Sequence, residues 1–260
     1  MKNHIPTSLF ICFLLFTGGC ANEDRNTAQP TDITQPSEAK NKPLVKSEKI
    51  MKAKIIEMQN DTILVADTEE NSGLYQVFAD ALLGDISPIS VGDMVEIGFD
   101  GSVLEIYPAI IANVDYIMLL EKGENFVGLY HDIFMKLYDT DTALNSDISF
   151  IALDLTKDKN LNDSEKNALL YLLWNTTQVE TRLATYQDLL SENLITLDGN
   201  SDFAQLETGI LFILETSEVE MENVTFTAEK WRSSLGAHCF NDCHAKKVNG
   251  EWHYEIGGEK

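Results

Sequence analysis

The sequence has few positively charged residues. Nineteen Lys and Arg residues stand against 42 Asp and Glu residues, which gives a formal net charge of −23 at pH 7. A surface of this sign repels phosphate groups, so the composition argues against nucleic acids and anionic headgroups as partners. It favours solubility in a crowded and charged cell envelope, and it leaves open the recruitment of cations or of a basic partner.

The sequence also lacks an apolar run long enough to span a bilayer, which takes about 20 residues. Leu9 to Phe16 is apolar apart from Cys12, and it is followed by Thr17-Gly18-Gly19-Cys20. We interpret residues 1–19 as a signal peptide, because small residues before a cysteine suit a processing peptidase. The stretch resembles a bacterial lipoprotein signal. The resemblance implies lipidation of Cys20 and a membrane anchor; the alternative is an ordinary secretory signal cleaved nearby.

Residues 20–48 have almost nothing to bury. They carry Pro30, Pro36 and Pro43 among many polar and charged side chains. Such a composition cannot offset its own ordering entropy, so we expect a flexible polar linker. About 25 residues of coil span roughly 25–30 Å, which is enough to hold the rest of the chain away from the lipid headgroups, at the outer face of the cytoplasmic membrane.

Residues 49–120 predict an all-β region. Short apolar or alternating runs are separated by turn residues, including Asn60-Asp61, Asn71-Ser72-Gly73 and Asp100-Gly101. Asp100-Gly101 joins two alternating runs and therefore predicts a hairpin. Six short strands favour a small barrel, because closure removes exposed edges. The expected strands are Ile50–Met58, Thr62–Asp67, Leu74–Ala79, Val91–Phe99, Val103–Tyr107 and Ile110–Leu120.

Three stretches of this region carry a family resemblance. Ser90 to Ile97, Phe99 to Gly101 and Glu105 to Ala109 resemble small extracytoplasmic domains of unknown function in lipoproteins of Gram-positive bacteria. The resemblance implies an OB-like barrel and brings no established activity. The expected strands lack basic residues interleaved with aromatic ones, which argues against oligonucleotide binding.

Residues 121–260 predict an α+β domain. Apolar residues recur at three- and four-residue spacing from Phe126 to Tyr138, which indicates an amphipathic helix with a core-facing stripe. A buried helix is expected over Ala168–Trp174. A short helix is expected at Thr185–Glu192, with Thr185 as its cap and Asp188 three residues after it. The remaining expected elements are strands at Ile148–Leu155, Gly209–Glu215 and Val224–Thr227, and a helix that begins after Thr227 and ends near Trp231–Gly236.

One loop of this domain partly matches a calcium-binding loop. Asp158, Asn160 and Asn162 match the first, third and fifth positions of an EF-hand loop. The sixth position lacks the required glycine, and Leu169 stands where the bidentate glutamate belongs. We therefore favour a helix start, in which Asn162 is the N-cap and Glu165 closes a capping box.

A cluster near the C-terminus contains His238, Cys239, Cys243 and His244. Asn249-Gly250 predicts a hairpin that places Lys247 opposite Trp252. In a continuous strand the two thiols lie roughly 13 Å apart on the core face and the histidines on the other, which excludes a shared zinc ion or a disulfide. The predicted core face is Cys239, Cys243, Ala245, Trp252, Tyr254 and Ile256.

The alternative is that the chain before Ala245 is not a strand. Cys239 to His244 is then a Cys-x-x-x-Cys-His sequence, one residue longer than the usual attachment motif for c-type haem. A helix would bring the two cysteines to one face. The corresponding function is an exported metal- or haem-binding redox protein.

A second resemblance covers residues 121–259. Ile151 to Leu155, Leu161 to Lys166, Lys230 to Ala237 and Asn249 to Gly257 resemble an uncharacterised C-terminal domain of clostridial and related lipoproteins. This family brings no known reaction or ligand.

The sequence as a whole predicts two folded modules on a lipid tether. It shows no convergent set of nucleophile, base and oxyanion donors, so we expect a non-catalytic envelope module without a cofactor, which binds an unknown envelope protein or small ligand. Another alternative is a hydrolase that uses Asp154 or Asp158. That alternative requires a deep pocket lined by both carboxylates.

Overall fold

The computed structural model describes residues 47–69, 73–78, 89–198 and 203–260. The expected signal peptide, Cys20, nearly all of the linker and the turn at Asn71-Ser72 lie outside these residues, so they stay predictions. No helix within the described ranges is long and apolar enough to cross a membrane.

The first part of the chain forms a curled, six-stranded sheet that resembles half of a barrel. Its strand order is β5-β3-β2-β1-β4-β6, and every pairing is antiparallel except β3 with β5. Apolar side chains such as Ile55, Val65 and Ile97 fill its concave side. The strands are β1 (Lys49–Gln59), β2 (Thr62–Asp67), β3 (Leu74–Phe78), β4 (Met94–Phe99), β5 (Ala109–Ile111) and β6 (Val114–Glu121).

The predicted hairpin at Asp100-Gly101 is wrong. Strand β4 pairs with β6, and in the run 103–107 only Leu104 forms a bridge, with Ile110. Pro108 cannot donate a ladder hydrogen bond, and the side chains of Ile106 and Tyr107 are exposed. Ile117 on β6 is buried instead, so the longer run supplies the partner of β4. That run is also split into β5 and β6.

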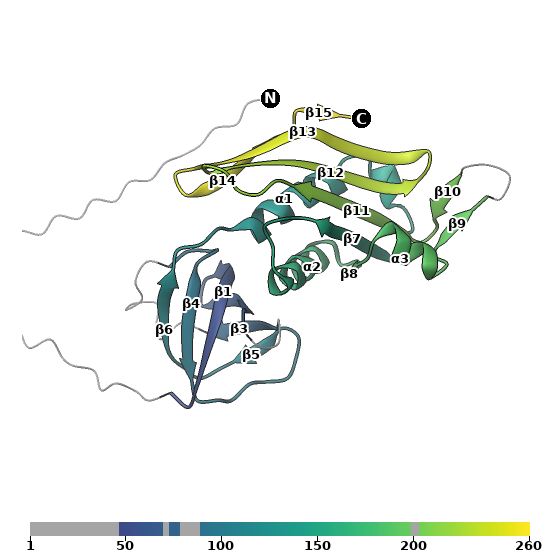
Figure 1. Ribbon diagram of the computed structural model, residues 1–260. Helices are drawn as coiled ribbons and strands as arrows, with labels where there is room; N and C mark the ends of the chain where they lie inside the picture. The colour runs from purple at the N-terminus through teal and green to yellow at the C-terminus, as the bar shows by residue number, and fades with distance from the viewer. Residues whose placement is uncertain (1–46, 70–72, 79–88, 199–202) are drawn as a thin grey trace, which may run out of the picture. The chain divides into compact units, whose positions relative to one another are not determined.

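The rest of the chain forms a nine-stranded sheet (Figure 1). Its main order is β14-β13-β12-β11-β7-β8, in which β11, β7 and β8 are parallel and the other neighbours antiparallel. The strands are β7 (Phe150–Lys157), β8 (Glu180–Leu183), β9 (Ile195–Leu197), β10 (Ala204–Leu206), β11 (Gly209–Thr216), β12 (Asn223–Ser233), β13 (Gly236–Val248), β14 (Glu251–Glu255) and β15 (Gly258–Glu259).

Helices cover both faces of this sheet. Helices α1 (Phe126–Asp139) and α2 (Asp163–Thr177) pack on one face, where Phe134 stacks on Phe212 with ring centroids 5.2 Å apart. Helix α3 (Tyr186–Ser191) and the β9–β10 pair pack on part of the other face. A short 3-10 helix, η1 (Thr142–Asn145), follows α1. The predicted stripe of α1 is confirmed: Phe126, Leu129, Tyr130, Ile133, Phe134 and Leu137 are buried.

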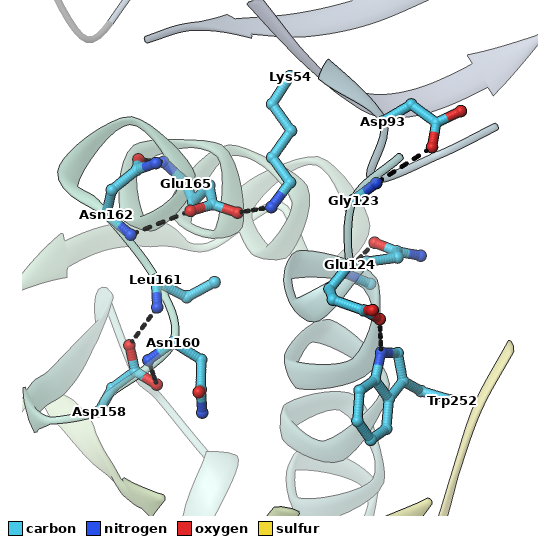
Figure 2. Close-up of polar contacts among 12 residues, drawn as sticks. Lys54, Asp93, Gly123, Glu124, Asp158, Asn160, Leu161, Asn162, Glu165 and Trp252 are labelled. Carbon is cyan, nitrogen blue, oxygen red and sulfur yellow. Dashed lines mark hydrogen bonds and ion pairs between the residues drawn. The ribbon is translucent and has the colours of Figure 1, made fainter. Parts of the chain in front are cut away.

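Two helix starts follow the predicted capping boxes. The Asn162 side chain accepts a hydrogen bond from the Glu165 backbone, and the Glu165 carboxylate accepts one from the Asn162 backbone (Figure 2). Thr185 and Asp188 make the same reciprocal pair at α3. Each box satisfies backbone N–H groups that have no partner inside the helix.

The helix predicted after Thr227 is wrong. Strand β12 continues to Ser233, and its side chains alternate between buried and exposed. The alternation is hidden in the sequence because the buried position 230 is a lysine. Lys230 is fully buried, and its ammonium donates to the carbonyl oxygens of Tyr138, in the last turn of α1, and of Asp141, which precedes η1. A cation at the C-terminus of a helix also interacts favourably with the negative end of the helix dipole.

The two sheets share a hydrophobic core. Ile56, Leu64 and Leu74 of the small sheet belong to the same buried cluster as α1, α2 and the large sheet. Lys54 of β1 forms an ion pair with Glu165 of α2, shown in Figure 2.

Candidate functional site

The hairpin predicted at Asn249-Gly250 is confirmed. Strands β13 and β14 pair with Lys247 opposite Trp252 and Ala245 opposite Tyr254. The strand continues before Ala245, back to Gly236, so the helical form of the Cys-x-x-x-Cys-His segment is not present. The hairpin could be predicted because its turn residues and its alternating side chains act locally.

The predicted face of Cys239 is wrong. Phe240 is fully buried and takes the core position, while Cys239 lies opposite Glu229 and Cys243 lies opposite Phe226. Asp242 has φ 51°, and the register between β12 and β13 shifts at this point. Such a bulge inserts one extra residue and reverses which side chains face the core.

The bulge leaves the four candidate ligands of the cluster apart. The His238 ring packs edge-on against Phe240, while His244 Nε2 lies 3.2 Å from a Glu255 carboxylate oxygen. Burial raises the pKa of both thiols, which disfavours the thiolate that metals and haem chemistry require. In the described part of the chain, no group of three or more His, Cys, Asp or Glu residues is placed to hold a metal ion.

The loop considered for calcium makes hydrogen bonds within the protein instead. Asp158 accepts from the backbone of Asn160 and, at 2.8 Å, from that of Leu161 (Figure 2). The Asn160 amide donates to the Tyr130 hydroxyl at 2.8 Å, and Asn162 caps α2. The side-chain oxygens of Asp158 and Asn162 therefore accept hydrogen bonds from the backbone, and these bonds hold the turn between β7 and α2.

The hydrolase alternative required one pocket lined by both Asp154 and Asp158. Asp154 lines a shallow hollow of ≈ 180 Å³ with Thr156, Lys166 and Asp188. Asp158 does not line this hollow, and its carboxylate is held in the turn described above. The described hollows therefore do not bring these two carboxylates together.

A different hollow combines polar and aromatic side chains. We define the α2 hollow by its lining residues, and its volume is ≈ 240 Å³. One wall is a row across β1, β2 and β3, because Glu57 pairs with Leu64 and Leu64 with Gln76. The lining residues are Glu57, Gln59, Thr62, Leu64, Gln76, Pro108, Tyr171 and Asn175.

The second wall comes from α2. Tyr171 and Asn175 are four residues apart, so they project from the same helix face into the hollow. The position of this helix is set by its buried side, including Leu169 and Leu173, and by the Lys54–Glu165 ion pair.

The polar groups of the α2 hollow are not used by the fold. The side chains of Glu57, Gln59, Gln76 and Asn175 make no hydrogen bond to another described residue. Burial, together with the charge of Glu57, raises the pKa of Tyr171, so its hydroxyl stays protonated at neutral pH. The hollow thus presents donors and acceptors that are free to bind a ligand.

An aromatic surface continues outward from the hollow. The Tyr107 ring meets Tyr171 edge-on with centroids 5.8 Å apart, and Tyr171 lies 5.9 Å from Trp174. Tyr107 is 67% exposed and Trp174 is 41% exposed. Large aromatic rings gain free energy when they leave water, so a ligand that covers these two rings would be stabilised by their burial.

Sequence reasoning missed this site. Residues 168–174 are nearly all apolar and predict a helix buried on all sides, yet only Ala168, Leu169, Leu172 and Leu173 are buried. The 3.6-residue period of the helix was the available signal, because it places Tyr171 and Trp174 on the face opposite the buried Leu169 and Leu173.

Comparison of the chain with protein-family models, with curated proteins and with solved structures finds no match in any of the three.

Proposed function

We propose that this protein is a lipid-anchored, non-catalytic binding module at the outer face of the cytoplasmic membrane, and that its ligand binds in the α2 hollow. The observation that carries the binding role is the set of unused polar side chains beside exposed Tyr107 and Trp174. A concave site with a few convergent polar groups is the usual form of a ligand site.

The anchoring part of the proposal rests on the sequence. Small residues before Cys20, the polar linker and the two resemblances to Gram-positive lipoproteins support it. We further propose that the small curled sheet is OB-like and that residues 121–260 are an α+β domain that packs on it. The strand order of each sheet supports this division.

The anchor is tested by metabolic labelling with a fatty acid in a Gram-positive host. Cys20→Ala should lose the label, whereas Cys12→Ala, which changes a residue of the removed signal, should keep both the label and membrane association after the signal is cleaved. Label that persists in Cys20→Ala would contradict the anchor.

The binding role is tested by co-sedimentation of the mature protein with delipidated envelope material from a Gram-positive bacterium. We expect the protein to sediment and Trp174→Ala to remain in the supernatant. Leu235→Ala, which removes another highly exposed apolar side chain, is the control and should sediment like the parent chain. A folded protein that does not sediment would contradict the proposal.

A further inference from the structure

We propose that the α2 hollow binds a neutral saccharide, with one sugar ring in the hollow and the adjoining rings across Tyr107 and Trp174. This inference rests on the proposed binding function and assigns the chemical class of its ligand.

The polar lining of the hollow matches hydroxyl groups. Gln59, Gln76 and Asn175 each carry an amide, which both donates and accepts hydrogen bonds, and Glu57 accepts them. A sugar hydroxyl also donates and accepts, so planar amides and a carboxylate can pair with two neighbouring hydroxyls of one ring. All four side chains lack a hydrogen-bond partner among the described residues.

The charge of the lining disfavours anionic ligands. Phosphate and carboxylate ligands are normally held by Arg or Lys, and the described residues that line this hollow include neither. Glu57 and the net charge of −23 would repel such a ligand. Glycans that carry phosphate or carboxylate groups in the bound ring are therefore poor candidates.

The aromatic surface matches the apolar face of a sugar ring. The C–H groups on one face of a pyranose are apolar and pack on flat aromatic rings, while Tyr and Trp keep a polar edge for hydrogen bonding. Tyr107, Tyr171 and Trp174 form a continuous chain of ring contacts from the hollow outward. Binding would cover the two exposed rings and recover part of their burial free energy.

The size of the hollow sets how much of a glycan it holds. Its ≈ 240 Å³ is below the roughly 300–1,000 Å³ of sites for drug-sized ligands. It therefore takes a single ring, and the rest of an oligosaccharide must lie outside on the aromatic surface. We expect affinity to increase with oligosaccharide length for this reason.

The test is a calorimetric titration of the full mature chain in detergent with chitotetraose and with cellotetraose. At least one neutral tetrasaccharide should bind, more tightly than its disaccharide and than an anionic hyaluronan tetrasaccharide. Trp174→Ala and Asn175→Ala should each weaken binding by about ten-fold or more, which corresponds to ~1.4 kcal/mol. Leu235→Ala should bind like the parent chain, and circular dichroism confirms that each variant is folded.

The outcomes separate the ligand class from the binding function. If envelope material binds and both neutral tetrasaccharides fail, the saccharide assignment is overturned and the binding module stands. If a tetrasaccharide binds equally well to all variants, the hollow is the wrong site. If neither envelope material nor tetrasaccharide binds the folded chain, both proposals are overturned.

Discussion

At the residue scale, Glu229 is a carboxylate that the large sheet partly buries. Glu229 on β12 lies opposite Ile213 and Cys239, and burial followed by the charge of Glu215 raises its pKa above the usual value. The folded chain therefore holds this proton more tightly than the unfolded chain does. The resulting contribution to stability is present below the unfolded pKa and is lost as the pH rises through the folded pKa.

Glu229→Gln should stabilise the protein at pH 7, because glutamine removes the charge that the folded state disfavours. We expect a gain of up to about 1 kcal/mol, measured as a rise in Tm, and a smaller gain at pH 4. Glu251→Gln, at the exposed first residue of β14, is the control. A loss of stability at pH 7 that exceeds the loss at pH 4 would contradict this account.

At the element scale, helix α2 depends on a motif of four residues. Asn162→Ala removes the N-cap acceptor and leaves the Glu165 backbone N–H without its partner. The free energy of unfolding should fall by about 1 kcal/mol in a denaturant titration. Glu180→Ala, a change at the exposed first residue of β8, should alter it much less, and equal effects of the two variants would exclude a special role for the cap.

The elements that the sequence predicted are those fixed by local interactions. The α1 stripe, both capping boxes and the Asn249-Gly250 turn are visible within a few residues, and the structure contains them. The partner of β4 and the bulge at Asp242 were missed, because each depends on strands that are distant in sequence. The full length of β12 was not predicted because the buried residue Lys230 is charged, and its hydrogen-bond partners lie about 90 positions away in the sequence.

The candidate site could not be predicted from the sequence for the same reason. Its walls come from residues 57–76 and 171–175, and no pattern within either segment indicates the other. The sequence pattern indicated a different candidate site, the cluster of His238, Cys239, Cys243 and His244. Its spacing is compact in the sequence, yet the extended strand and the bulge distribute its side chains over both faces of the sheet.

At the scale of the whole molecule, the shared core implies that the two sheets unfold together. The Lys54 and Glu165 side chains are 14% and 4% exposed, so their ion pair is nearly buried between β1 and α2. Ser164 adds a buried hydrogen bond of 2.5 Å to the carbonyl of Asp67 on β2. These polar contacts fix how α2 meets the small sheet, which is also what shapes the α2 hollow.

Glu165→Gln should lower the free energy of unfolding by roughly 3–5 kcal/mol, because it leaves the Lys54 ammonium buried without its counter-ion. Glu69→Gln is the matched control. The partner of Glu69 is Lys52, which lies on β1 like Lys54, and the side chains of Glu69 and Lys52 are about half exposed. The control should cost at most about 1 kcal/mol. Similar losses for the two variants would contradict the role of the buried pair.

The central claim, that the α2 hollow is the binding site, is tested most directly by hydrogen exchange of the mature protein with and without envelope material. We predict slower amide exchange in the segments 57–64 and 171–175, and unchanged exchange in the β13–β14 hairpin. Protection confined to the hairpin, or absent from both hollow segments while the protein is bound, would contradict the claim.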